Sequence, residues 1–247
     1  MNERNDENDH LNAPSDQTAE GQRAFFGRRK GHKLRAHQAD LIAQLLPRLT
    51  VDISGVTDPT ELFDTPIDNI RLEIGFGGGE HLIAEASKFP NTGFIGCEPY
   101  VNGMAKILSL IETNNIGNIR LFAGDASELL AWLPTHALAR IDLIHPDPWP
   151  KRRHWKRRFV QDATIAAMTR VLNPSGEFRF VSDISDYCAW TLAHFARSPN
   201  FVWTAERAAD WREPWPEYTM TRYGRKAKRE GRDAAYLIFS KAEKSAA

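Results

Sequence analysis

Residues 70–80 read IRLEIGFGGGE, an apolar strand-like run that ends in a glycine-rich turn. Glycine adopts positive φ easily and has no Cβ, so its backbone can lie close to a bound ligand. A strand that leads through such a turn into a helix is typical of the ligand-binding edge of a doubly wound α/β sheet. This stretch therefore predicts a nucleoside-type site between a strand and the helix that follows.

Strand-like and helical patterns alternate along the rest of the chain. β-rich runs occupy residues 70–74, 93–97, 119–123, 141–144, 177–181, 201–205 and 236–239, and helical patterns lie near 36–48, 80–88, 100–114, 127–132, 158–172 and 185–197. Alternation of this kind predicts βαβ units that place helices against a parallel sheet. The expected fold class is α/β: a doubly wound, mostly parallel, seven-stranded, Rossmann-like sheet with helices on both faces.

The charges are segregated, although the chain has 32 basic and 32 acidic residues and a formal net charge of zero. Residues 1–20 carry six acidic residues and one basic residue, whereas residues 21–35 carry six basic residues and no acid. An acidic, polar segment cannot bury enough apolar surface to offset its ordering entropy. We expect a disordered tail over 1–22. One domain would follow over 23–247, with a basic N-terminal segment (23–50) and a basic insertion (206–234).

The two cysteines argue against a structural metal or a disulfide framework. Cys97 and Cys188 lie far apart and have no paired Cys or His at ligand spacing. The N-terminus has no apolar leader, and no apolar run approaches the ~18 residues that span a bilayer. We therefore expect a cytoplasmic protein that binds no metal and has no membrane partner.

The acidic residues around the glycine turn indicate which nucleoside ligand it takes. In a dinucleotide fingerprint, a third glycine would follow Gly75 and Gly77 at the position of Glu80. A carboxylate at the start of that helix would repel a pyrophosphate. S-adenosylmethionine has no phosphate and carries two positive groups, which Glu73 suits. A nicotinamide-dependent oxidoreductase is the alternative that Glu80 disfavours.

Two further carboxylates follow the next two strands. Glu98 ends the second strand, where it can accept hydrogen bonds from both ribose hydroxyls, and Asp125 follows the third, where it can accept one from an adenine amino group. Parallel strands bring their carboxyl ends to one edge of the sheet. Three acids that follow three successive strands therefore favour S-adenosylmethionine as the cofactor.

The loop after the fourth strand reads HPDPWPKRRHWKRR at residues 145–158. Pro146 and Pro148 stiffen the turn, Asp147 offers acceptors to a base edge, and Trp149 offers a stacking face. The basic run (residues 151–158) then carries six positive charges in eight residues. Phosphate contacts beside a stacking side chain predict an RNA substrate.

These residues resemble the tRNA (guanine-N7)-methyltransferase family over roughly residues 23–240. The motifs that carry the resemblance are FGRR at 26–29, LEIG at 72–75, GDA at 124–126, DPW at 147–149 with its basic run, SD at 182–183 and TRY at 221–223. Adenine-N6 methyltransferases have Asp/Asn-Pro-Pro-Tyr/Phe at the strand-four position instead. The resemblance implies a class I methyltransferase fold and methyl transfer to N7 of the variable-loop guanosine of tRNA.

The resemblance also implies roles for individual residues. From its place in the loop and the chemistry of the reaction, we expect Asp147 to be catalytic, holding the guanine edge and stabilising the charge that moves onto the base. The expected cofactor-binding residues are Glu73, Gly75, Gly77, Glu98, Asp125 and Asp147, and the expected tRNA-binding residues are Lys151, Asp183, Thr221, Arg222, Tyr223 and Gly224. Gly224 departs from the family pattern, which has Glu there.

Several alternatives stay open from the residues alone. Asp183 could instead cap the helix that begins near Ser185. His81 and His145 are interpreted as packing or capping residues. The acceptor could be another base or another RNA, and a non-catalytic RNA-binding relative of the same fold is a further alternative.

Overall fold

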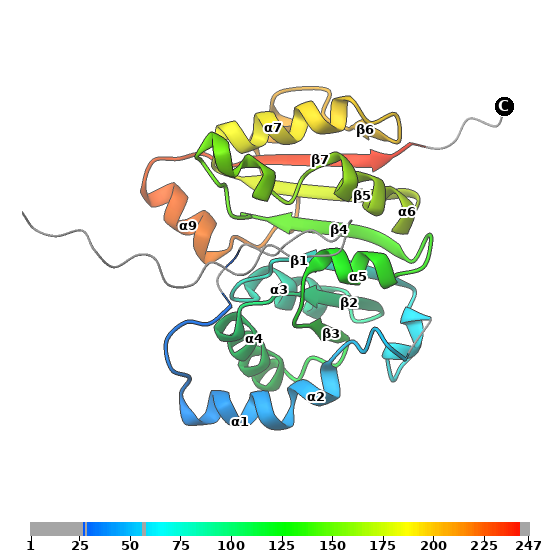
Figure 1. The fold of residues 1–247 in the computed structure, drawn as a ribbon, viewed down its shortest axis with the longest axis vertical. Helices are drawn as coiled ribbons and strands as arrows, with labels where there is room; N and C mark the ends of the chain where they lie inside the picture. Colours follow the sequence, from blue (N-terminus) through cyan, green and yellow to red (C-terminus); the bar gives the residue numbers. More distant parts are fainter. Residues whose placement is uncertain (1–26, 28, 56–57, 243–247) are drawn as a thin grey trace, which may run out of the picture.

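The computed structural model describes residues 27, 29–55 and 58–242, so the predicted acidic tail lies outside the described residues. A seven-stranded sheet runs through the molecule in the order β3-β2-β1-β4-β5-β7-β6 (Figure 1). The strands are β1 (Asn69–Ile74), β2 (Thr92–Cys97), β3 (Ile119–Phe122), β4 (Leu138–Ile144), β5 (Leu172–Ser182), β6 (Phe201–Trp203) and β7 (Ala235–Lys241). All seven predicted strands are confirmed.

Strand direction follows from the connections. Strands β1 to β5 pair in parallel, and β7 pairs antiparallel with both β5 and β6. The chain builds outward from β1 to β3, then crosses to β4 on the other side of β1. The strand order therefore reverses between β1 and β4, which is where open α/β sheets bind ligands.

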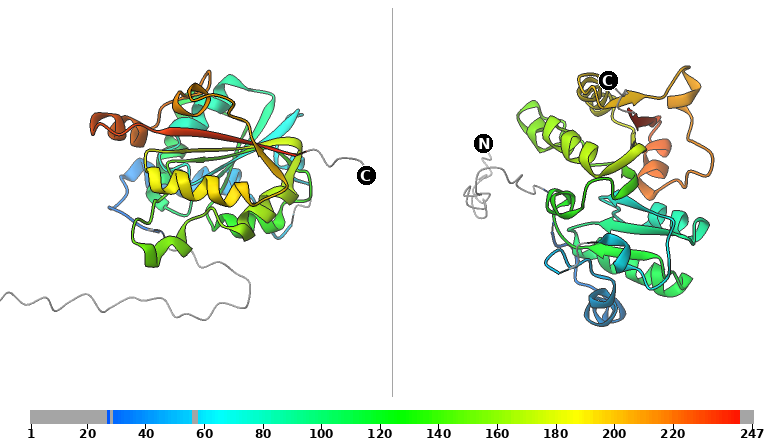
Figure 2. Two further views of the ribbon diagram at one scale, coloured as in Figure 1. Left: turned by 90° about the horizontal axis from the view of Figure 1, so that it is seen from above. Right: turned by 90° about the vertical axis from the view of Figure 1, so that its right-hand side faces the viewer.

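Helices cover both faces of the sheet (Figure 2). On one face lie α3 (Glu80–Lys88) and α4 (Val101–Asn114), and on the other lie α5 (Ala126–Trp132), α6 (Asp162–Val171) and α7 (Ser185–Ala196). Each layer buries its own apolar cluster. Leu82, Ile107 and Leu108 pack on the first face, and Leu129, Met168 and Phe195 pack on the second. The predicted doubly wound, Rossmann-like class is confirmed.

The N-terminal helix expected near 36–48 is two helices, α1 (Ala36–Gln44) and α2 (Leu46–Leu49). Pro47 stands in the first turn of α2, where its missing N–H costs no helical hydrogen bond. A 3₁₀ turn, η1 (Pro59–Leu62), leads from these helices toward β1.

The helix expected over 158–172 begins later than its pattern suggests. A 3₁₀ segment, η2 (Arg152–Arg157), occupies the basic run, and α6 starts at Asp162. The intervening amides of Phe159 and Val160 donate to Tyr187 Oη of α7, so they are not available to a longer helix. A contact distant in sequence therefore sets this helix boundary.

The insertion between β6 and β7 carries α8 (Ala209–Arg212) and α9 (Arg222–Arg229). Thr221 is the N-cap of α9, and its Oγ1 accepts from Gly224 N–H at 3.2 Å. Of the helices that the structure describes, none is long and apolar enough to cross a membrane.

Candidate functional site

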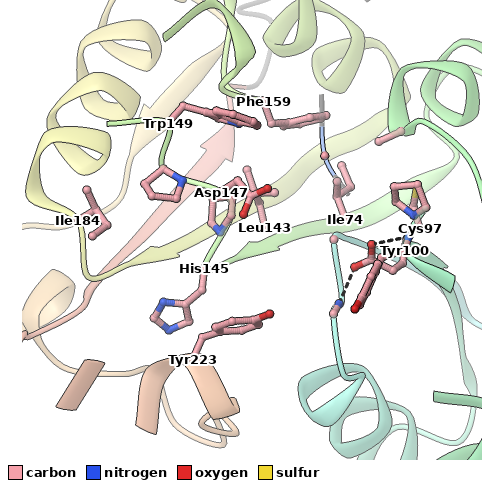
Figure 3. Close-up of a pocket in the computed structure, with 18 of the residues that line it drawn as sticks. Ile74, Cys97, Tyr100, Leu143, His145, Asp147, Trp149, Phe159, Ile184 and Tyr223 are labelled. Atoms are coloured by element: carbon pink, nitrogen blue, oxygen red, sulfur yellow. Dashed lines mark hydrogen bonds between the residues drawn. The ribbon is translucent and has the colours of Figure 1, made fainter. Parts of the chain in front are cut away.

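A cavity of about 560 Å³ opens at the carboxyl ends of β1, β2 and β4, where the strand order reverses (Figure 3). This volume is in the range of small-molecule sites. Its donor side is formed by Gly75, Gly77, Gly124, Ala126 and residues 98–100. Its acceptor side is formed by residues 145–149 of the strand-four loop and by Arg157, Phe159, Asp183, Ile184, Arg222, Tyr223, Lys226 and Arg232. The two sides share one opening.

The glycine turn shapes the donor side through its backbone. Gly75 and Gly77 have φ of 70° and 56°, in the left-handed region that glycine adopts without strain. Helix α4 packs close to the turn, because a Cβ on Gly103 would lie 2.4 Å from the carbonyl oxygen of Gly77. Both glycines of the predicted cofactor site line the cavity, so peptide groups rather than side chains form this part of its wall.

Glu98 is the buried carboxylate of the donor side. One oxygen accepts from Gly77 N–H at 2.8 Å and the other from Tyr100 N–H at 3.0 Å. Burial raises the pKa of Glu98, the two backbone donors oppose that rise, and the carboxylate of Asp147 across the cavity adds to it. Glu98 therefore holds the turn in place and also presents negative charge to the cavity.

Glu73 lies beneath the turn, and its side chain points to a different partner. Its Oε2 pairs with His81 Nδ1 of α3 at 2.8 Å, and both side chains are buried. Burial raises the pKa of Glu73. Burial pulls the pKa of His81 down, but the facing carboxylate outweighs this and leaves it raised. Among the described residues that line the cavity, Glu73 is absent, so the structure places it as a support between β1 and α3.

Asp125 and Glu80 have local partners. Asp125 is the N-cap of α5, and its carboxylate accepts from Ser127 N–H and Oγ, both at 2.7 Å. Its neighbours Gly124 and Ala126 line the cavity. Glu80 begins α3 and forms an ion pair with Lys106 at 2.5 Å. A carboxylate therefore stands at the helix start where a pyrophosphate-binding turn would need positive potential.

Asp147 occupies the middle of the cavity. Figure 3 shows it between Trp149 and Phe159 on one side and Tyr223 on the other. Its side chain is reached by solvent through the opening, and the surrounding protein atoms still raise its pKa by desolvation. His145 and Trp149, on either side of it, have φ of 49° and 43°. Non-glycine residues in this region are strained and often mark functional loops.

Asp183 does not cap α7. The N-cap of α7 is Ile184, without a side-chain hydrogen bond. The Asp183 carboxylate instead accepts from His145 Nδ1 at 3.1 Å and from Arg232 Nε at 2.7 Å. Burial raises the pKa of Asp183, but the donors Arg232 and His145 and a backbone hydrogen bond outweigh it, so the pKa is lowered overall. Asp183 therefore lines the cavity and ties the strand-four loop to the insertion.

Helix α9 supplies one wall of the acceptor side. Arg222, Tyr223 and Lys226 line the cavity, whereas Thr221 and Gly224 are buried on the inner face of the helix. A Cβ on Gly224 would lie 3.1 Å from His145 Nε2, so this position packs against the strand-four loop. Lys151 is exposed just outside the cavity lining, at the start of η2.

Known proteins match this chain closely. A family model described as "Putative methyltransferase" matches residues 68–237. A tRNA (guanine-N(7)-)-methyltransferase of Nitrobacter hamburgensis is 76% identical over 221 residues, covering 89% of this chain and 87% of the relative. Enzymes of the same name from Rhodopseudomonas palustris and Bradyrhizobium diazoefficiens are 71% and 72% identical, covering 96% and 89% of this chain and 89% and 94% of theirs.

The chain belongs to the tRNA (guanine-N(7)-)-methyltransferase family. Solved structures agree on the fold alone. The 16S rRNA methyltransferase KamB has a TM-score of 0.55 at 15% identity, covering 72% of this chain and 89% of its own. TrmN from Thermus thermophilus has a TM-score of 0.50 at 15% identity, covering 74% and 46%.

Several residues that line the cavity were not identified as site residues from the sequence patterns. Tyr100, Phe159, Ile184, Lys226 and Arg232 all line the cavity. Tyr100 stands two residues after Glu98, a local signal that could have found it. Arg232 is brought in by its ion pair with Asp183, 49 positions away, and no spacing rule predicts that. In the part of the chain that the structure describes, no cluster of three His, Cys, Asp or Glu could hold a metal.

Proposed function

We propose that this chain transfers a methyl group from S-adenosylmethionine to N7 of a guanosine in the variable loop of tRNA. The observation that carries this is a single cavity with a backbone-lined, acidic donor side facing an aromatic acceptor side around Asp147. The family of the chain supports the same reaction.

The donor side fits S-adenosylmethionine on its chemistry. When bound, this cosubstrate supplies an electrophilic methyl group on a positively charged sulfur. Glu98 has free lone pairs for ribose hydroxyls beyond the two backbone donors it accepts. Gly75 leaves open space, since a Cβ built there meets nothing within 4 Å. The negative charges of Glu98 and Asp147 repel each other across the cavity, and this repulsion adds to the raised pKa of Glu98. A cation bound between the two carboxylates would relieve it.

The acceptor side fits a purine whose N7 attacks directly. Guanine N7 has an in-plane lone pair and no proton, so no general base is required before methyl transfer. Positive charge then moves from sulfur to the base, and the carboxylate of Asp147 can stabilise it there. Trp149 and Tyr223 flank Asp147 with aromatic faces on which a base can stack. The residues therefore act by positioning and electrostatics.

Basic side chains outside the cavity suit the phosphates of tRNA. Lys151, Arg152, Arg153 and Lys156 are exposed on the basic run. A second, shallow hollow lies along α9, lined by Met220, Arg222, Arg225, Lys228 and Arg229. We expect tRNA binding to weaken steeply with salt, because each phosphate contact releases bound counterions.

The decisive experiment uses an unmodified tRNA transcript and methyl-labelled S-adenosylmethionine. Nuclease digestion should place the label on 7-methylguanosine in the variable loop. Two matched transcripts act as controls: one with adenosine at that position and one with 7-deazaguanosine, which has carbon in place of N7. Neither should accept the label there.

Two other results would redirect the proposal. Label on a different base would indicate another RNA methyltransferase activity of this family fold. Absence of label together with absence of calorimetric binding to S-adenosylmethionine would favour a non-catalytic RNA-binding relative.

A further inference from the structure

Arg158 differs from the other residues of the basic run. Its side chain is 0% exposed, whereas Lys151, Arg152, Arg153 and Lys156 are exposed. A guanidinium buried in protein is costly unless its charge and its donors are matched. A side chain that solvent does not reach is also not reached by a phosphate. The charge of Arg158 must therefore act inside the protein.

Three aromatic rings and a carboxylate enclose this guanidinium. Its central carbon lies 4.9 Å from the ring centroids of Trp155 and Tyr187 and 5.3 Å from that of Trp190. These distances are within the range of cation–π attraction. Nη2 donates to the Asp186 carboxylate. Asp186, Tyr187 and Trp190 all belong to the first turns of α7, so Arg158 is anchored on that helix.

Nη1 donates to the backbone carbonyl of Asp186 at 3.5 Å, and a further donor of Arg158 reaches the strand-four loop. Nε donates to the carbonyl oxygen of Pro148 at 2.9 Å. Pro148 has no N–H, so its carbonyl is the one backbone polar group through which the peptide can be held. This carbonyl lies between Asp147 and Trp149, and Trp149 has the left-handed φ of 43°. Arg158 therefore connects α7 to the strained segment that presents the carboxylate to the cavity.

The neighbours of Arg158 face the opposite way. Arg157 lines the cavity with its guanidinium 5.0 Å from the Trp149 ring centroid, and Phe159 lines it beside Trp149. Residues 157 and 159 thus form the cavity wall while residue 158 holds that wall to α7.

We propose that Arg158 is a positioning residue for methyl transfer, setting the orientation of Asp147 and Trp149 through the Pro148 carbonyl, and is not a tRNA phosphate ligand. This inference rests on the proposed function for its kinetic part. Its geometric part stands on the contacts of Arg158 alone.

The first test replaces Arg158 with Lys. Lysine keeps the charge, but its single ammonium lacks the planar fork that reaches Pro148 and Asp186 together. The substrate is tRNA transcript, and rates are divided by the concentration of S-adenosylmethionine-binding sites measured by calorimetry. Arg158→Lys should then lower kcat by about tenfold to a hundredfold, as expected for a misplaced reacting group. The KM for tRNA and the salt dependence of tRNA binding should stay close to those of the unaltered chain.

The matched control is Lys156→Gln, an exposed base of the same run. It should show the opposite split: a higher KM for tRNA and a slope of log affinity against log salt that is shallower by about one. If Arg158→Lys shows this second pattern with kcat preserved, Arg158 binds phosphate and the proposal is overturned.

A structural readout keeps the proposal testable without turnover. A crystal structure of Arg158→Lys should show the Pro148 carbonyl and the side chains of Asp147 and Trp149 displaced, while α7 keeps its place. If Arg158→Lys does not fold, Asp186→Asn removes the carboxylate partner from the solvent side and should give a smaller change in the same direction. Unchanged positions of the Pro148 carbonyl, Asp147 and Trp149 in the folded variant would overturn the proposal. Absence of methylation by the unaltered chain would instead overturn the proposed function, and the structure of the variant would still decide whether Arg158 holds the loop.

Discussion

The two sides of the cavity are built differently. The donor side consists of short segments that directly follow β1, β2 and β3, and its shape comes from backbone: glycines with positive φ and peptide N–H groups that Glu98 holds. The acceptor side draws on the strand-four loop, the end of η2, the start of α7 and α9, and its shape comes from side-chain contacts among them. The comparison indicates that donor-side changes should act on cosubstrate affinity, and acceptor-side changes on turnover.

The largest expected effect is on the acceptor side, at Asp147. Asp147→Asn keeps the shape and removes the charge, so kcat should fall on the order of 10²-fold, comparable with the loss of one preorganised electrostatic group. The pKa of Asp147 is raised, so its charge does not stabilise the free fold and the thermal midpoint should hardly change. Steady-state kinetics and thermal unfolding measure the two quantities. Near-normal turnover would remove Asp147 from its proposed role.

The next effect is on the donor side, at Glu98. Glu98→Gln places an amide NH₂ against one of two backbone donors, Gly77 N–H or Tyr100 N–H. Losing a charged hydrogen-bond acceptor should weaken S-adenosylmethionine binding by about 10- to 100-fold. Calorimetry measures this affinity, and kcat at saturating cosubstrate should change much less. An equal loss in kcat would show that a donor-side change affects turnover as much as cosubstrate affinity.

A pH titration tests the charge shared across the cavity. Desolvation raises the pKa of both Glu98 and Asp147. An ordinary carboxyl group has a pKa of about 4 and loses its charge near that pH. Because the pKa values of Glu98 and Asp147 are raised, affinity for the cationic cosubstrate should begin to decline at a higher pH as the pH falls. The free energy of unfolding of the unliganded protein changes with pH in the opposite direction. The two groups contribute to stability at low pH, and this contribution is lost as the pH rises through their raised pKa values. Calorimetry across pH would contradict this if affinity were flat down to about pH 4.

The smallest expected effect is at Gly224, on the inner face of α9. Glycine inside a helix usually costs about 1 kcal/mol relative to alanine. Here a Cβ would press on His145 Nε2 at 3.1 Å, and Asp183 clamps that ring, so it cannot yield easily. Gly224→Ala should therefore give no gain in the free energy of unfolding and should raise the KM for tRNA by a few-fold. A clear gain in stability with unchanged KM would show that this wall is looser than the contacts indicate.

Sequence patterns predicted which residues lie at the donor edge of the sheet, because each of them directly follows a strand that can be recognised locally. Strand periodicity and the glycine spacing place Gly75, Gly77 and Glu98 at one edge of the sheet, and the structure puts all three on the cavity wall. Glu73 and Asp125 lie at the same edge, but the Glu73 carboxylate hydrogen-bonds with His81 and the Asp125 carboxylate caps the start of α5. Spacing assigns a residue to an edge, and the choice of partner depends on what packs beside it.

The sequence by itself determined the order of strands and helices, the glycine turn, the acidic strand ends and the Asp147 loop, since each follows from near-neighbour chemistry. Tertiary structure alone decided that Arg158 is buried against α7 while Lys151, Arg152, Arg153 and Lys156 of the same run are exposed. It also decided that Asp183 joins His145 to Arg232 instead of capping a helix. The physical reason is that burial and ion pairing depend on residues tens of positions away, and no local pattern encodes those distances.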